Sequence, residues 1–310
     1  MGLVLAFPQA AIQRSSDISL FTEFLRRERG AAKNTVDSYL LDLGKFQAWL
    51  SPRGKSLEQV ERTDIREYLA ALMAEGLSPQ SARRKLSTFR TFYRLLLDDE
   101  RITVNPVLGI PMPKVWKALP KFLELAELEK MVRWREAQKD YLALRDKAIL
   151  LTLFASGLRV SELVNLTVAD VDLDAGYLKV WNGKGGKDGI APLSPPAIEA
   201  VKAYIQTDRP KLDRNGESPY LFLAGRLRGS KLTRQSLFLR VRRIGRDALG
   251  RDVGIHEFRH GCATALIKGG ADIRDIQAVL RHSDINTTQI YTHTDITYLR
   301  GIYDKCHPRA

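Results

Sequence analysis

Apolar residues recur at helical spacing through the first third of the chain. In residues 81–97, Leu86, Phe89, Tyr93 and Leu96 stand at i, i+3, i+7 and i+10, which places them on one side of a helix. The same spacing predicts further helices at 18–29, 34–50 and 63–75. We therefore predict a small bundle of four helices for this part of the chain.

Proline interrupts this pattern after residue 104. The segment NPVLGIPMPKVWKALPK, residues 105–121, contains four prolines, which lack a backbone donor and disfavour helix in the residue before them. We predict an extended linker at 106–121. It would separate one domain at 17–105 from a second at 122–310, with residues 1–16 as an N-terminal extension.

Beyond the linker, the pattern predicts helices around one pair of strands. The segments YLKVW (177–181) and IAPL (190–193) indicate short strands joined by a turn rich in Gly and Lys, NGKGGKDG. The predicted fold class is mainly α, a four-helix first domain followed by a mostly helical domain with a small β-hairpin. The predicted helices are 125–135, 142–155, 160–166, 196–207, 233–249, 256–269 and 273–280, with a last one beginning at 283 or 284.

Length and composition exclude several classes of protein. The 310 residues suffice for about two domains, and 44% hydrophobic with 27% charged residues is the composition of a folded chain. No apolar run approaches the roughly 20 residues of a membrane span. Two cysteines cannot form a disulfide framework. Since the start, MGLVLAFPQA, lacks the basic region of a secretory signal, we expect a cytoplasmic protein with no membrane association.

The chain is basic, with 49 Lys and Arg against 36 Asp and Glu and a net charge of +13. Nine of these cations fall between Arg226 and Arg251, where Asp247 is the only acid. Such a charge run is often a solvated helix face, but this density favours a polyanion, most simply nucleic acid. A second basic group lies in the helix at 81–97. The predicted DNA contacts are Arg83, Arg84, Lys85, Arg90, Arg240, Arg242 and Arg243.

Residues 256–260, HEFRH, match the H-E-x-x-H pattern, in which two histidines bind zinc and the glutamate is a general base. A third ligand in register is missing, because Ala263 and Val279 occupy the positions that would complete such a site. We therefore expect no metal. His256 and Arg259, three residues apart, would instead share a helical face and address one anion together.

Other residues suited to phosphate chemistry are spread along the second domain. Gly157 and small residues lead into a helix that begins near Arg159, and a helix N-terminus favours an anion. Lys184 stands in the GKGGK turn, which is no nucleotide loop because Asp188 follows where Ser or Thr is required. A lysine there is usually solvated, but its ammonium could protonate a leaving alkoxide. His282 and Tyr291 follow in LRHSDINTTQIYTH, residues 280–293.

These segments, taken in order, resemble the tyrosine recombinases. The likeness is carried by ASGLRVSEL (155–163), GKGGK (183–187), HEFRHGCAT (256–264) and LRHSDINTTQIYTH (280–293). The helical segment SARRKLSTFRTFYRLL (81–96) resembles the core-binding, SAM-like domain of that family. From about residue 17 onward the chain is similar to the Xer-type recombinases, and the resemblance implies that residues 122–310 form the catalytic domain.

The resemblance also implies a role for each residue. Tyr291 would be the nucleophile that forms a 3′-phosphotyrosyl bond, Arg159 and Arg259 would hold the non-bridging oxygens, and Lys184 would protonate the 5′-oxygen. His256 would assist proton transfer, and His282 would stabilise the charge on the phosphate. No cofactor, metal or ATP is implied, because the phosphotyrosine conserves the energy of the broken bond. The implied partner is double-stranded DNA, with four protomers assembled on two sites.

Three departures from the family pattern and several alternatives stand beside this interpretation. Arg281 replaces a usual Gly, Ile255 a common Pro, and Gly189 a common Arg. The role that the resemblance favours is the resolution of chromosome or plasmid dimers. The alternative is a phage or mobile-element integrase, which uses the same chemistry. A DNA-binding protein without catalysis is less consistent with six retained catalytic residue types, and activity in EDTA would exclude a metalloprotease. The sequence leaves open whether a second recombinase joins the tetramer and whether a regulatory DNA translocase controls it.

Overall fold

Two separate hydrophobic cores organise the chain. The computed structural model describes residues 16–114, 121–181, 189–225, 229–281 and 301–308. The chain divides into two compact units, residues 1–118 and 119–310, and the division lies inside the proline-rich segment 106–121.

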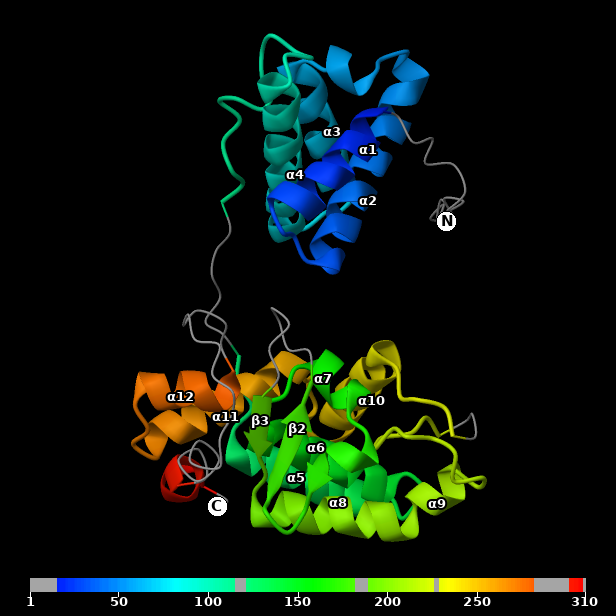
Figure 1. Ribbon diagram of the computed structural model, residues 1–310, viewed down its shortest axis with the longest axis vertical. Coiled ribbons are helices and arrows are strands. Elements are labelled where there is room, and N and C mark those ends of the chain that lie inside the picture. The colour runs from blue at the N-terminus through cyan, green and yellow to red at the C-terminus, as the bar shows by residue number, and fades with distance from the viewer. Residues whose placement is uncertain (1–15, 115–120, 182–188, 226–228, 282–300, 309–310) are drawn as a thin grey trace. The chain divides into compact units, whose positions relative to one another are not determined.

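In the N-terminal unit, the described residues 16–114 form a bundle of four α-helices (Figure 1). The capping of α4 follows directly from its sequence. Ser78 precedes the helix and its Oγ accepts a hydrogen bond from the backbone N of Ser81 at 3.2 Å, while Pro79 takes the first position, where no donor is needed. The predicted four-helix bundle is confirmed. Its helices are α1 (Ser16–Glu23), extended by a π-helical turn (Phe24–Glu28), α2 (Lys33–Leu50), α3 (Arg62–Ala74) and α4 (Pro79–Asp98), with 3-10 turns at Ser51–Arg53 and Leu57–Gln59.

The apolar stripe of α4 is the centre of this bundle. Leu86, Phe89, Tyr93 and Leu96 are all fully buried, as their spacing predicts. Phe89 packs on Phe46 of α2 with ring centroids 4.8 Å apart, a distance typical of paired aromatic rings. The buried hydroxyl of Tyr93 donates to the carbonyl of Leu57 at 3.0 Å, so the core leaves this polar atom satisfied.

A buried carboxylate ties α2 to α4. Asp42 accepts a hydrogen bond from Lys85 Nζ at 2.7 Å, and its second oxygen lies 2.7 Å from Arg84. The Lys85 side chain is only 6% exposed and that of Asp42 1%. This burial contradicts the sequence-based prediction of Lys85 as a DNA contact, because an ammonium enclosed with its carboxylate cannot reach a phosphate.

The second unit is larger and mostly helical (Figure 1). Its helices agree closely with the predicted ones, except that the short α9 was not predicted. No helix in the described ranges of the chain is both long and apolar enough to cross a lipid bilayer. The helices are α5 (Leu125–Ala137), α6 (Ala143–Ser156), α7 (Val160–Asn165), α8 (Pro195–Thr207), α9 (Arg209–Leu212), α10 (Arg234–Leu249), α11 (Ile255–Lys268) and α12 (Ile273–Leu280).

Helix α6 runs through the middle of this unit. Nearly all its residues are buried, and it contacts α5, α8 and α11. A helix that is apolar on all sides must be enclosed by other elements, and the run from Ala148 to Ala155 meets that condition. The C-terminal end of α6 therefore lies among its neighbours, and the turn that follows it is held on several sides.

A three-stranded antiparallel sheet, in the order β1-β2-β3, flanks the helices. β2 (Tyr177–Val180) pairs with β3 (Gly189–Pro192), with Val180 opposite Gly189. The predicted hairpin is confirmed, and β1 (Val171–Asp172) adds a short strand that the sequence pattern did not indicate. The turn between β2 and β3 lies outside the described residues.

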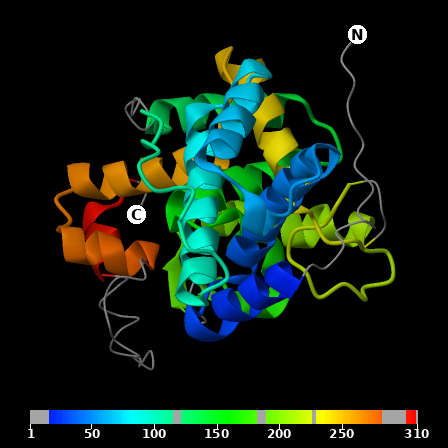
Figure 2. The same ribbon diagram turned by 90° about the horizontal axis from the view of Figure 1, so that it is seen from above.

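A helix at residues 301–306 lies beside α11 and α12 in both views (Figures 1 and 2). Tyr303 is fully buried and its ring stacks on His307, with centroids 4.4 Å apart. A Cβ atom on Gly269, at the end of α11, would overlap the carbonyl oxygen of Cys306. The close approach of these backbones therefore requires glycine at position 269. A helix beginning at 283 or 284, as predicted, would lie outside the described residues.

Candidate active site

Arg159 stands at the junction between α6 and α7. Gly157 ends α6 in the left-handed conformation with φ 56°, and a Cβ there would overlap the side chain of Leu280. Arg159 then occupies the N-cap position of α7. The local sequence thus turns the chain sharply and presents the arginine at a helix start, as predicted.

Arg259 reaches the same place from α11. One of its guanidinium nitrogens donates to the carbonyl of Gly157 and another to the carbonyl of Leu280. Arg159 Nη2 lies 3.4 Å from the carbonyl oxygen of Arg281. Two arginines that are 100 residues apart in sequence therefore meet over the turn after α6 and the end of α12. This proximity is the one that shared binding of a phosphate requires.

The crowding of positive charge changes the acidity of Arg259. Burial, together with the charges of Arg159 and Arg281, lowers the pKa of Arg259 to about 10. The guanidinium remains protonated at neutral pH. An anion bound there would relieve the repulsion between the arginines, so the cluster favours a negative ligand.

Glu162 is a site residue that the sequence analysis did not single out. Its Oε1 accepts from Arg159 Nη1 at 2.6 Å, and its Oε2 accepts from the backbone N of Arg159 at 2.8 Å. Arg281 Nη2 lies 3.1 Å from the same Oε2. Burial alone would raise the pKa of Glu162, but the charge of Arg281 and the hydrogen bonds from Arg159 outweigh burial and lower that pKa. An acidic residue three positions after a helix start is the capping signal that could have identified it.

His256 lies on the first turn of α11, three residues before Arg259, and its side chain is exposed. The helix begins at Ile255, which is buried in the core of the unit. Ile255 therefore packs the first turn of the helix against the core. His256 is thus placed on the helix that carries Arg259, consistent with the predicted pairing.

Glu257, the middle residue of the zinc-like motif, is fully engaged in the fold. Its carboxylate accepts a hydrogen bond from the backbone N of Gly254 at 2.8 Å and lies 2.7 Å from Arg251. It therefore caps α11 and is not free to serve as a general base. In the described part of the chain, no group of three or more His, Cys, Asp or Glu residues is placed to hold a metal ion.

Lys184, His282 and Tyr291 lie outside the described residues. The described residues next to these segments are the start of β3 and the end of α12. β3 begins at Gly189, directly after the hairpin segment, and α12 ends at Leu280 with Arg281 as its C-cap. The arginines, Glu162 and His256 are therefore the described part of the predicted catalytic set.

The basic residues of α10 differ in how far their charge is neutralised. Arg240 is 26% exposed and lies 2.7 Å from Asp146, a buried carboxylate that also binds Arg135 and Arg145. Arg242 pairs with Asp252 at 2.5 Å. The side chain of Arg243 is 74% exposed, and its pair with Asp247 is longer, at 3.6 Å. Of the three predicted contacts, Arg243 is therefore the most available to a phosphate, and Arg240 is mainly a structural cation.

The predicted contacts on α4 separate in the same way. Arg83 and Arg90 are exposed, and Arg84 is shared between solvent and Asp42. Arg90 donates to the carbonyl of Ile110 at 2.7 Å, which ties the segment after α4 back to the bundle. Arg83 offers its guanidinium most freely of the three.

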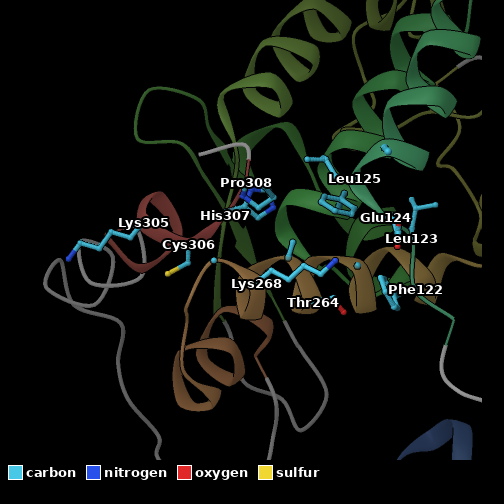
Figure 3. A pocket seen from close by; sticks show the side chains of 15 residues that line it. Phe122, Leu123, Glu124, Leu125, Thr264, Lys268, Lys305, Cys306, His307 and Pro308 are labelled. Carbon is cyan, nitrogen blue, oxygen red and sulfur yellow. The ribbon is translucent and has the colours of Figure 1, made fainter.

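The second unit contains a cavity of about 480 Å³ (Figure 3). It is bounded by the start of α5, by α11 and by residues 305–308 at the end of the chain, and its wall includes Phe122, Lys268 and Cys306. Of the predicted catalytic residues that the structure describes, Arg159, His256 and Arg259, none lines it. The cavity therefore belongs to the packing of the C-terminal segment.

Comparison with known proteins identifies relatives along nearly the whole chain. Residues 121–297 match the model of the phage integrase family, and residues 18–100 match that of the phage integrase N-terminal SAM-like domain. The tyrosine recombinase XerD of Pseudomonas aeruginosa is 40% identical over 294 residues, which cover 94% of this chain and 97% of the relative. XerD of Staphylococcus haemolyticus is 36% identical over 295 residues, covering 94% and 99%.

Solved structures share the fold at lower identity. The Tn1549 transposon integrase in complex with circular intermediate DNA has a TM-score of 0.66 and 20% identity, covering 91% of this chain and 98% of that one. The XerH site-specific recombinase bound to palindromic difH substrate has a TM-score of 0.64 and 24% identity, covering 92% and 83%.

Proposed function

Since the chain belongs to the phage integrase family of tyrosine recombinases and is a site-specific DNA recombinase, we propose that its six predicted catalytic residues act together on one DNA phosphodiester. The observation that carries this proposal is the meeting of Arg159 and Arg259 at the end of α6. Both guanidinium groups are partly exposed and bonded to main-chain carbonyls or to Glu162. Each can turn donors toward the two non-bridging oxygens of a phosphate.

The covalent step that we propose is the one that the resemblance to the tyrosine recombinases implies for these residues. The phenolic oxygen of Tyr291 attacks phosphorus, forming a 3′-phosphotyrosyl bond, and the bond from phosphorus to the 5′-oxygen breaks. Lys184 gives its proton to the departing 5′-oxygen, while His256 assists transfer of the phenolic proton and His282 stabilises the charged phosphate. Attack by another 5′-hydroxyl reverses the step and joins a new strand. Because one ester replaces another, no ATP is consumed.

The positive cluster supplies what the nucleophile needs. A free tyrosine has a pKa near 10, so little phenolate exists at neutral pH without nearby cations. Fixed cations also stabilise the charge that develops on the phosphate, where loss of one donor costs roughly 100- to 1000-fold in rate. The arginine pair would therefore serve both substrate binding and the chemical step.

We assign the two domains to different tasks on DNA. Residues 17–105 form the core-binding domain and 122–310 the catalytic domain, joined by the linker 106–121 and preceded by the extension 1–16. Arg83, Arg90 and Arg243 are the cations that we place on the DNA backbone, because they keep the most exposed charge. Four protomers on two double-stranded sites would exchange the strands, with a second recombinase or a DNA translocase as candidate additional partners in the cytoplasm.

The biological role that we favour is the resolution of chromosome or plasmid dimers. Identity of 34–40% to proteins named XerD, over 94–96% of this chain, supports it. Integration of a mobile element is the second candidate, since the Tn1549 transposon integrase shares the fold. The two roles use the same active site and differ only in the DNA sites that are joined.

Mapping of covalent protein–DNA complexes tests the proposal. The wild-type protein is expressed in its own host, covalent complexes are captured, and the attached DNA is sequenced. We expect adducts at one preferred chromosomal site and none with Tyr291→Phe, although that variant still binds the recovered DNA. Adducts of normal yield in Tyr291→Phe would remove Tyr291 from the mechanism, and adducts at the ends of a mobile element would favour the integrase role.

A further inference from the structure

Arg281 ends α12 in a conformation that glycine favours. Its backbone has φ 55° and ψ 50°, the left-handed region in which a side chain is disfavoured. In the described chain only Glu100 and Lys139 share a positive φ among residues other than glycine. Backbone strain of this kind concentrates at functional sites, where the side chain concerned takes part in the arrangement of the site.

The side chain of Arg281 turns back into the site. Nη2 lies 3.1 Å from Glu162 Oε2, and Nη1 donates to the carbonyl of Val279 at 3.2 Å. The side chain of Arg281 is 9% exposed, against 23% for the side chain of Arg159. Arg281 is thus more buried than Arg159 and contacts the same carboxylate.

The backbone around Arg281 contacts the catalytic arginines directly. The carbonyl of Leu280 accepts from Arg259, and the carbonyl of Arg281 lies 3.4 Å from Arg159 Nη2. One turn of chain therefore meets both arginines through its main chain and Glu162 through its side chain. The ion pair to Glu162 joins α12 to α7, and it holds this turn in place.

Building on the proposed function, we propose that Arg281 is a positioning residue, which sets Arg159 and Arg259 for the phosphate by anchoring the end of α12 to Glu162. Its burial keeps it from touching the DNA itself. Arg281 also neutralises part of the negative charge of Glu162. Arg159 is therefore bound less tightly by this carboxylate and keeps N–H donors for the phosphate. A glycine at this position would take the turn without strain but could not make the ion pair.

A series of substitutions at one position tests this role in the full-length chain. Arg281→Lys, Arg281→Gln and Arg281→Gly are compared with wild type on a nicked duplex carrying the sequence recovered from the covalent complexes. For Arg281→Gln and Arg281→Gly we expect the single-turnover cleavage rate to fall by about 10- to 100-fold, the size of effect that a small misplacement of catalytic groups produces. The dissociation constant for DNA should stay within about 2-fold, because Arg281 is not a DNA contact. Arg281→Lys should recover most of the rate. Arg133→Gln, which removes an exposed arginine of α5, is the control and should cleave like wild type.

A double-mutant cycle with Glu162→Gln supplies a readout that general destabilisation would not move. If Arg281 acts through Glu162, Arg281→Gln should cost much less in the Glu162→Gln background than in wild type. Wild-type cleavage by Arg281→Gln, or losses that multiply independently in the double variant, would overturn the proposal. If Arg281→Gly lowers the unfolding temperature, the cleavage rates of Arg281→Lys and Arg281→Gln decide whether Arg281 positions the site. A wild-type protein that forms no adduct refutes the proposed function itself, and with it the basis of this role.

Discussion

The carboxylate of Glu162 binds Arg159 twice, accepting from the guanidinium at 2.6 Å and from the backbone nitrogen at 2.8 Å. The first bond orients the side chain, and the second caps α7 at the residue that carries it. Because the cap and the ion pair use the same carboxylate, the position of the helix and the position of the catalytic side chain are coupled.

Replacing Glu162 with Gln should slow DNA cleavage more than it weakens DNA binding. The amide keeps the shape but loses the charge that holds Arg159 and Arg281. We expect the single-turnover cleavage rate to fall by about 100-fold. Glu129→Gln serves as the control, because the pair that Glu129 forms with Arg133 is long, 3.9 Å, and exposed to solvent. A Glu162→Gln protein that cleaves at the wild-type rate would show that the carboxylate does not position Arg159.

The stabilising effect of Glu162 should disappear in acid. Its pKa is lowered in the folded protein, so its contribution is complete above the pKa of the unfolded chain and is lost as the pH falls through the lower, folded value. Wild type and Glu162→Gln should therefore differ in free energy of unfolding at pH about 7, and the difference should shrink as the pH falls below about 4.3, the ordinary pKa of a glutamate. Urea unfolding across this range measures the difference. The contributions of all other carboxylates cancel in this difference, because both proteins contain them. A difference in unfolding free energy that does not change with pH would contradict this account.

Most of the fold follows from local pattern in the sequence. The stripe of α4 from Leu86 to Leu96 is buried as its spacing requires, and strong caps such as Ser78 mark where helices begin. The short β1 strand and α9 escaped prediction, because two or four residues carry no period of their own. Tertiary contacts decide such segments, for example the pairing of Val171 with Leu178.

The partners of charged residues were much harder to predict. A count of cations between Arg226 and Arg251 includes side chains that the fold neutralises, such as Arg251, which binds Glu127 of α5. Asp252 stands one residue beyond that segment and pairs with two of its arginines. Sequence distance does not reveal such pairs, since Asp146 lies 94 residues from Arg240. The charge run therefore indicated a partner class correctly while overstating how many of its cations are free.

The two arginines Arg240 and Arg243 should have separable roles. Arg240→Ala leaves Asp146 with one cation fewer in a buried cluster, and we expect a loss of stability of about 1–3 kcal/mol. Arg243→Ala should leave the unfolding free energy within about 0.5 kcal/mol, weaken DNA binding and reduce its salt slope by about 1. Thermal unfolding and DNA titrations at several salt concentrations measure both. The assignment is wrong if the two variants exchange these effects.

In the N-terminal bundle, Asp42→Asn should destabilise the fold strongly. The substitution leaves Lys85 buried without its carboxylate, and breaking a buried pair in this way costs about 3–5 kcal/mol. Asp98→Asn is the matched control, because Asp98 is exposed and lies 3.9 Å from Arg94. Chemical unfolding of the full-length chain should show an early transition in Asp42→Asn alone. Equal stability of the two variants would mean that Asp42 does not hold α2 to α4.

Removal of metal ions should leave DNA cleavage unchanged, despite the zinc-like sequence HEFRH. In zinc enzymes with this motif the glutamate must act on a metal-bound water. Here the Glu257 carboxylate caps the backbone N of Gly254 and pairs with Arg251, so both of its oxygens are occupied by the fold. Arg259 places a positive charge between the two histidines in sequence, which opposes a dication. We expect protein treated with EDTA and then desalted to form covalent complexes at the untreated rate. Loss of the adduct in EDTA, with recovery on adding zinc, would instead make His256 and His260 metal ligands and require a different role for Arg259.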